Sequence, residues 1–167
     1  MRCLDMVEIK HIRQSNDGIN WKCGAACLEM IFNYYGIPCN QNTIWEAIKC
    51  RRSDNRFQYF ALTNSLAEYA INQGLNATIH KSDSEKWSSE LETIDQLSIP
   101  AILSVKNKAG KGHFVVFLGI KNGKYIFCDP DSPKETDKYE YLQVRQMWSP
   151  CGTEVKGFVY IVFEKAG

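Results

Sequence analysis

Three short segments of the sequence carry the residue types that nucleophilic catalysis requires. The first, residues 21–27 (WKCGAAC), contains Cys23 in the opening turn of the strongest predicted helix. The unpaired main-chain amides and the dipole at a helix N-terminus stabilise a thiolate, the reactive form of cysteine. We therefore expect Cys23 to be a nucleophile, with the small residues Gly24 and Ala25 leaving room for the backbone of a substrate.

The other cysteines fit structural roles better. Cys27 lies one helical turn after Cys23, among Leu28, Met30 and Ile31, where a cysteine behaves as a small apolar residue. The chain has seven cysteines, an odd number, and it is long enough to fold without cross-links. We therefore expect reduced thiols and no disulfide framework. The absence of a Cys-x-x-Cys pair also argues against a structural zinc site.

His113 begins the second segment, an apolar run over residues 112–119 (GHFVVFLG) that is predicted to be a strand. Imidazole is the usual base for a thiol near neutral pH, and a side chain at the rim of a strand can face a cleft. A histidine satisfied by structural hydrogen bonds is the alternative. His80, in another predicted strand, and His11, near the N-terminus, have no comparable context.

Asp129 ends the third segment, directly after the apolar run 125–128. An aspartate before Pro130 is an ordinary strand terminator, but it is also placed to orient a catalytic histidine. Asn122-Gly123 joins this run to the strand that begins near His113, which predicts a hairpin. The hairpin brings His113 and Asp129 to the same rim of the sheet.

The geometry of this hairpin decides whether the two side chains share a face. With the two-residue loop Asn122-Gly123, Val116 pairs with Asp129, and His113 lies on the opposite face. With a three-residue loop that begins one residue earlier, Val115 pairs with Asp129, and His113 becomes its diagonal neighbour on the same face. We predict the three-residue loop, or a bulge of equal effect.

The elements around these residues follow the hydrophobic periodicity, which is helical in the first half and strand-like in the second. That order is typical of an α+β fold. Helices are predicted over 21–35, from after Asn40 to Ile48, over 62–73 and over 84–91, and strands over 77–80, 101–105, 113–120, 125–128 and 158–163.

Length and composition indicate one domain, residues 1–167, with its own core. Lys and Arg number 20 against 19 Asp and Glu, which gives no argument for a nucleic-acid or membrane partner. The segment 1–11 lacks the apolar run of a signal peptide, and no stretch is apolar enough to span a bilayer. We expect a cytoplasmic protein, while delivery to another cell stays open.

Taken in order, Gln14 and the segments 22–28 (KCGAACL), 34–36 (YYG), 112–116 (GHFVV) and 129–130 (DP) resemble the bacteriocin-processing peptidases. These are papain-like cysteine peptidase domains that cleave leader peptides after a double glycine. The resemblance implies a papain-like fold, with Cys23 as nucleophile, His113 as the group that accepts its proton and Asp129 as the group that orients the imidazole. It also implies that Gln14 helps to bind the oxyanion.

The sequence departs from the family pattern beside the nucleophile. The spacer 15–22 between the glutamine and the cysteine is longer than usual, so that Asn16 or Asn20 is an alternative oxyanion donor. Lys22 replaces the usual acidic residue, and a cation there favours the thiolate.

The resemblance implies a peptide or protein substrate, cleaved after small residues, and no metal or organic cofactor. Family members are commonly fused to an ABC transporter, so this chain is either a fragment of such a protein or acts alone. Two alternatives use the same fold. One is a glutamine deamidase or acyltransferase that acts on a side-chain amide, and the other is a catalytically silent peptide-binding module.

Overall fold

The computed structural model describes residues 6–15, 22–51, 59–152 and 155–167. The helices in these ranges are α1 (Cys23–Tyr34), α2 (Gln41–Ile48), α3 (Thr63–Asn72), α4 (Trp87–Leu97) and α5 (Tyr141–Trp148). The strands are β1 (Lys49–Arg51), β2 (Tyr59–Ala61), β3 (Leu75–Lys81), β4 (Ala101–Lys106), β5 (Gly112–Lys121), β6 (Lys124–Cys128), β7 (Asp137–Tyr139) and β8 (Val159–Lys165).

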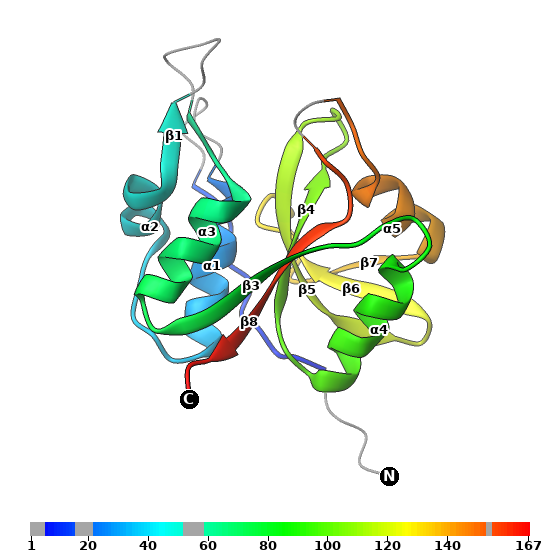
Figure 1. Ribbon diagram of the computed structural model, residues 1–167, viewed down its shortest axis with the longest axis horizontal. Helices are drawn as coiled ribbons and strands as arrows, with labels where there is room; N and C mark the ends of the chain where they lie inside the picture. The colour runs from blue at the N-terminus through cyan, green and yellow to red at the C-terminus, as the bar shows by residue number, and fades with distance from the viewer. Residues whose placement is uncertain (1–5, 16–21, 52–58, 153–154) are drawn as a thin grey trace.

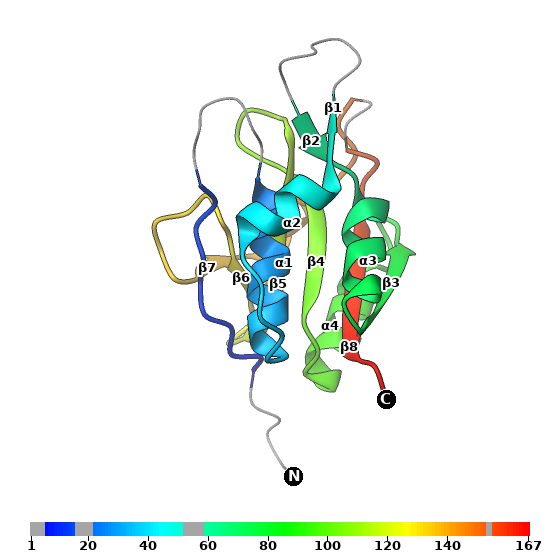
Figure 2. The same ribbon diagram turned by 90° about the vertical axis from the view of Figure 1, so that its left-hand side faces the viewer.

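A six-stranded antiparallel sheet forms the centre of the molecule, in the order β3-β8-β4-β5-β6-β7. The helices α1, α2 and α3 lie together on one side of it, whereas α4 and α5 lie on the other (Figures 1 and 2). The short strands β1 and β2 pair with each other beside the first group of helices. The α+β class predicted from the sequence is confirmed.

Alternation along the strands gives each face of the sheet its own core. Val116 of β5 packs with the side chains of α1, α2 and α3. Its neighbours Val115 and Phe117 point the other way and pack with Trp87 of α4 and Trp148 of α5. Because β5 contributes to both cores, its position relative to α1 is tightly set.

The predicted elements are present, with one clear shift of boundary. The helix predicted over 84–91 begins at Trp87 and ends at Leu97. Its start is delayed because a carboxylate oxygen of Asp83 accepts hydrogen bonds from the main-chain N–H groups of Glu85 and Lys86, which forms a turn before the helix. Its end is marked by Ser98, which adopts a left-handed conformation with φ 52°.

The hairpin between β5 and β6 corrects one prediction and confirms its alternative. Lys121 pairs with Lys124 across a two-residue turn in which Asn122 and Gly123 have φ of 53° and 74°. The three-residue loop is therefore wrong, because Asn-Gly suits the tight turn with two positive φ values. A bulge lies instead between Phe117 and Gly119, and the pairs beyond it run Phe117 to Phe127 and Val116 to Cys128.

The bulge has the effect that the longer loop was expected to have. With Val116 opposite Cys128, the next pair places Val115 opposite Asp129. His113 is then two residues from Val115 and shares the face of Asp129. The side chains of His113 and Asp129 can meet only because this one extra residue is inserted.

Gly119 and Asp95 hold the bulge in place. Gly119 has φ 142°, a conformation that favours glycine, and a Cβ atom there would lie 2.5 Å from Oδ1 of Asp95. The same oxygen accepts a hydrogen bond of 3.0 Å from the main-chain N–H of Ile120. The carboxylate therefore occupies the space that a side chain at Gly119 would need.

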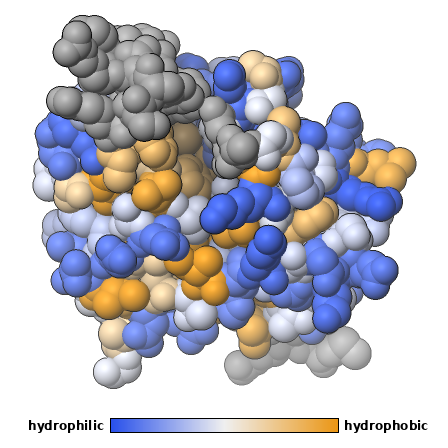
Figure 3. Space-filling view, turned by 45° about the horizontal axis from the view of Figure 1, so that its top comes forward, coloured by the Kyte–Doolittle hydropathy of each residue, from blue (hydrophilic) through white to orange (hydrophobic). Residues whose placement is uncertain are grey.

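The surface is mixed in character. Figure 3 shows hydrophilic residues over most of its right-hand side and apolar residues gathered near the centre and on the left. The most exposed large apolar side chains, Ile71, Leu97 and Leu142, belong to three different helices, and isolated residues of this kind are normal. Among the described residues, no helix combines the length and apolar character needed to cross a bilayer.

Candidate functional site

The structure brings Cys23, His113 and Asp129 together at one end of the molecule. Cys23 is the first residue of α1, His113 is the second residue of β5, and Asp129 directly follows β6. Nε2 of His113 lies 2.7 Å from Oδ1 of Asp129, and the imidazole is also hydrogen-bonded to Cys23. Because a carboxylate only accepts, Nε2 carries a proton, and Nδ1 is the nitrogen that faces the thiol.

Both partners of the His113–Asp129 contact are shielded, and their pKa values move in opposite directions. Burial alone would lower the pKa of His113, but hydrogen bonds and negative charge from Asp129 and Cys23 outweigh it and raise the pKa from 6.5 to about 10. Burial would raise the pKa of Asp129, but the hydrogen bond and charge of His113 lower it overall. The arrangement therefore favours an imidazolium beside a carboxylate.

The N-terminus of α1 lies at the candidate nucleophile Cys23. Lys22 precedes the helix, and its side chain makes no capping hydrogen bond. The main-chain N–H groups of the first turn of α1 point out of the helix at its N-terminal end, where Cys23 lies. Cys23 itself is only 6% exposed.

The expected role of Gly24 and Ala25 is corrected. Both residues are buried, and a Cβ atom at Gly24 would lie 3.2 Å from Leu66 and 3.3 Å from Phe114. Their small size is therefore needed for close packing of α1 against α3 and β5, and not for clearance around a substrate.

Cys27 has the core position that the sequence predicts. Cys27 is fully buried, its Sγ lies 3.4 Å from the main-chain oxygen of Phe114, and burial raises the pKa of its thiol. The six cysteines within the described ranges form no disulfide.

Gln14 lies beside the turn that follows Asp129. Its main-chain N–H donates a hydrogen bond of 2.9 Å to the oxygen of Pro130. Its side-chain oxygen is shielded from solvent and has no hydrogen-bond partner in the part of the chain that the structure describes. This oxygen is an acceptor, so only the Nε2 group of the same amide could donate to a bound oxyanion. The alternative donors, Asn16 and Asn20, lie outside the described residues.

His11 is a contact of the site that sequence reasoning missed. Its Nε2 lies 2.7 Å from the main-chain oxygen of Asp129. The residues around His11 in the sequence do not indicate this contact, because its partner Asp129 lies 118 residues away. The one available signal was its spacing of three residues from Gln14, which is too weak to interpret alone.

This geometry can support nucleophilic attack on a carbonyl. The thiol of Cys23 can transfer its proton to Nδ1 of His113, and Asp129 can stabilise the resulting imidazolium and fix its orientation. The N–H group of Cys23, at the free end of α1, is placed to bind a developing oxyanion. Such an arrangement is suited to acyl transfer through a thioester.

The raised pKa of His113 predicts how stability depends on pH. The stabilisation is complete below the ordinary pKa of 6.5 and is lost as the pH rises through about 10. We expect the melting temperature of the wild type to fall more between pH 6.5 and 10 than that of a His113→Gln variant. Thermal melts followed by circular dichroism test this. His80→Gln, which alters an exposed histidine, is the control and keeps the wild-type dependence; parallel curves for wild type and His113→Gln would contradict the prediction.

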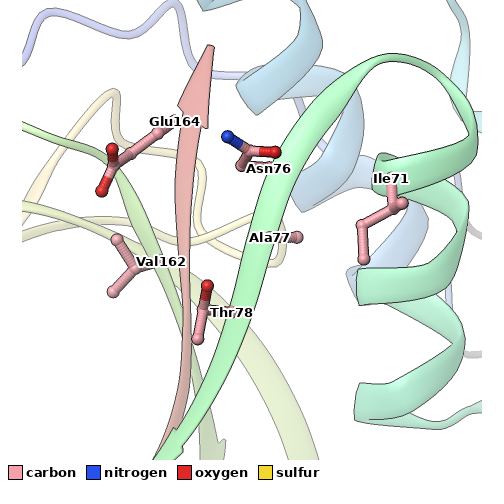
Figure 4. Close-up of a pocket in the computed structure, with 6 residues that line it drawn as sticks. All are labelled: Ile71, Asn76, Ala77, Thr78, Val162 and Glu164. Atoms are coloured by element: carbon pink, nitrogen blue, oxygen red, sulfur yellow. The ribbon is translucent and has the colours of Figure 1, made fainter. Parts of the chain in front are cut away.

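A separate surface pocket lies between α3 and the paired strands β3 and β8 (Figure 4). Its lining is Ile71, Asn76, Ala77, Thr78, Val162 and Glu164. None of these residues is a cysteine or a histidine, so this pocket does not carry the chemistry of Cys23 and His113.

Comparison with known proteins places the chain among peptidases. A family model described as the Peptidase C39 family matches residues 8–153. No curated protein matches the chain.

Three solved structures illustrate the similarity in fold. The first, a double glycine motif protease from an AMS/PCAT transporter in complex with the leader peptide, is 20% identical, with a TM-score of 0.67 over 98% of this chain and 96% of that one. The peptidase domain of Streptococcus ComA, a bi-functional ABC transporter involved in a quorum sensing pathway, is 19% identical. Its TM-score is 0.71, over 95% of this chain and 99% of that one. The third is the N-terminal peptidase C39 like domain of the toxin secretion ATP-binding protein from Vibrio parahaemolyticus. It is 19% identical, with a TM-score of 0.59 over 86% of this chain and 96% of that one.

Proposed function

Since this chain belongs to the Peptidase C39 family and is therefore a cysteine peptidase, we propose that it cleaves a leader peptide after a double glycine through Cys23, His113 and Asp129. The observation that carries the assignment of residues is the hydrogen-bonded series from Asp129 through His113 to Cys23 at the N-terminus of α1. In the proposed reaction, the thiolate of Cys23 attacks the scissile carbonyl, and His113 protonates the leaving amine. Water then resolves the thioester.

Small residues before the scissile bond fit the surroundings of the nucleophile. Cys23 and His113 are both less than one-tenth exposed. An enclosed thiol of this kind accepts glycine more readily than a residue with a bulky side chain. The solved double glycine protease similar to this chain was crystallised with a leader peptide, which supports the same class of substrate here.

We propose that Gln14 completes the site as an oxyanion donor together with the main-chain N–H of Cys23. The support is the hydrogen bond that holds the main chain of Gln14 against the turn beside Asp129, and the amide Nε2 of its side chain is the atom that would donate to the oxyanion. A partnership with an ABC transporter, in the same chain or a separate one, is proposed because ComA is itself a bi-functional ABC transporter. The single domain 1–167 and the cytoplasmic location expected from the sequence stay predictions.

A leader-peptide assay read by mass spectrometry tests the function. Wild type and Cys23→Ala are each incubated with a panel of peptides that end their leaders in Gly-Gly, Gly-Ala or Ala-Ala, and with matched peptides that carry bulky residues there. We expect cleavage after the small pair by the wild type and by Cys27→Ala, and none by Cys23→Ala. Cys27→Ala is the matched control, because this cysteine lies on the same helix but in the core.

Each alternative gives a different mass spectrum. A glutamine deamidase leaves every peptide bond intact and produces only the small mass increase that accompanies conversion of an amide to an acid. An acyltransferase joins the acyl group of the side-chain amide to an added amine and releases ammonia, so the peptide gains the mass of the amine less that of ammonia. A silent binding module changes no mass and protects the bound peptide from added protease. Any of these patterns, in place of Cys23-dependent cleavage, would overturn the proposal.

A further inference from the structure

His11 makes a tertiary contact with the turn that carries Asp129. Its Nε2 lies 2.7 Å from the main-chain oxygen of Asp129. A carbonyl oxygen only accepts hydrogen bonds, so Nε2 carries the proton and donates it. His11 is half-buried, whereas its neighbour Lys10 is exposed. The imidazole is thus held against the turn and does not project into solvent.

A second hydrogen bond attaches the same segment to the same turn. The main-chain N–H of Gln14 donates to the oxygen of Pro130 at 2.9 Å. The two donors are three residues apart, and their acceptors are consecutive. Residues 11–14 are therefore fixed on the turn at two points, and Figure 2 shows this N-terminal segment running beside β6.

The carboxylate of Asp129 is held from within the turn as well. Its Oδ1 accepts from Nε2 of His113 at 2.7 Å and from the main-chain N–H of Asp131 at 2.8 Å. Its main-chain oxygen accepts from the N–H of Ser132 at 3.1 Å in addition to His11. With both the side chain and the main chain of Asp129 engaged, a shift of the turn moves the carboxylate relative to His113.

We propose that His11 is a positioning residue for the peptidase reaction. It holds the main chain at Asp129 so that the carboxylate meets His113, and it fixes the register of the segment that carries Gln14. The proposal rests on the proposed function, because it assigns His11 a part in the same site. His11 acts through Asp129 and Gln14, and its loss displaces both groups from the reacting atoms.

Two substitutions separate the hydrogen bond from the rest of the side chain. His11→Ala removes the donor, whereas His11→Gln keeps an N–H donor at a similar distance from the main chain. Lys10→Ala is the matched control on the exposed side of the same segment. The assays are cleavage of the leader peptide, with kcat and KM separated, and the rate at which iodoacetamide alkylates Cys23, followed by peptide mapping. Melting temperatures of all variants are measured alongside.

We expect His11→Ala to lower kcat about tenfold, which corresponds to the loss of one partly buried hydrogen bond, with KM changed by less than about twofold. His11→Gln restores kcat to within about threefold of the wild type, and Lys10→Ala matches the wild type. Alkylation of Cys23 near neutral pH follows the same order. A purely structural role would lower the melting temperature of His11→Ala and leave the kcat of its folded fraction unchanged.

Unchanged kcat in His11→Ala would overturn the proposal. So would equal loss of kcat in His11→Gln and His11→Ala at equal melting temperatures. Failure of the wild type to cleave any leader peptide is a different result, because it overturns the proposed function. His11 is then judged by alkylation alone, which must slow in His11→Ala and recover in His11→Gln, and any other order overturns the inference.

Discussion

A chain carrying His113→Ala is expected to lose roughly 10⁴-fold or more in kcat on the leader peptide, and adding Cys23→Ala to it is expected to cost nothing further. The reason is that the thiol and the imidazole act as one unit. Nδ1 of His113 faces Cys23, while Nε2 is held by Asp129 at 2.7 Å. Without the imidazole, the thiol has no group that accepts its proton. Without the thiol, the imidazole has no nucleophile to activate.

The measurement is single-turnover cleavage by the two single variants and the double variant. Asp129→Asn is a useful third variant, because an amide in this position no longer supplies the charge that stabilises the imidazolium of His113. His80→Gln serves as the control for removal of an exposed histidine outside the site. Additive losses, with the double variant far below both single variants, would mean that Cys23 and His113 do not act together.

Gly119→Ala is expected to reduce kcat by about 10²-fold, although Gly119 lies outside the site, because a misplacement of catalytic groups by about 1 Å has effects of this size. The added Cβ would meet Oδ1 of Asp95 at 2.5 Å in a backbone conformation that favours glycine. The bulge must then distort or straighten. A straight strand would place Val116 opposite Asp129 and turn His113 to the other face of the sheet.

Gly74→Ala is the matched control for this substitution. Gly74 also has a positive φ, of 96°, but a Cβ there would meet no atom within 4 Å. Both variants carry backbone strain, and only Gly119→Ala carries the clash with Asp95. Asp95→Asn keeps an oxygen that accepts from the N–H of Ile120 and is expected to stay active. Asp95→Ala lacks this acceptor and is expected to lose activity. Equal activity of Gly119→Ala and Gly74→Ala at matched melting temperatures would contradict this account of the bulge.

The sequence was informative wherever a local pattern determines structure. The apolar stripe that begins at Cys23 predicted α1, and Asn40 predicted the start of α2, where its side chain accepts from the N–H of Thr43. Short elements with few buried residues were missed. Among the residues of α5 only Val144 and Trp148 are buried, and the helix is stabilised by reciprocal capping between Glu140 and Gln143. Such an element has too little periodicity to be recognised.

The residues of the candidate site could be predicted from the sequence, whereas the contacts that hold them in place could be predicted less well. Cys23, His113 and Asp129 follow from a helix start, a strand start and a strand end. The turn Asn122-Gly123 has a strong local signature, but the bulge depends on Asp95 of α4, which lies 25 residues from its partner Ile120. His11 likewise depends on a partner distant in sequence. Contacts of this kind arise from tertiary packing, which no local pattern records.

The order of strands in the sheet has a consequence for synthesis. Strand β8 is made after all the other strands of the sheet, yet it lies between β3 and β4. On the ribosome, β3 has no neighbour in this sheet until residues 159–165 have emerged, and β4 has only β5. Pairing across such separations is slow, because loops must close before the contacts form. A nascent chain that holds Cys23, His113 and Asp129 is thus expected to remain inactive until its final strand inserts.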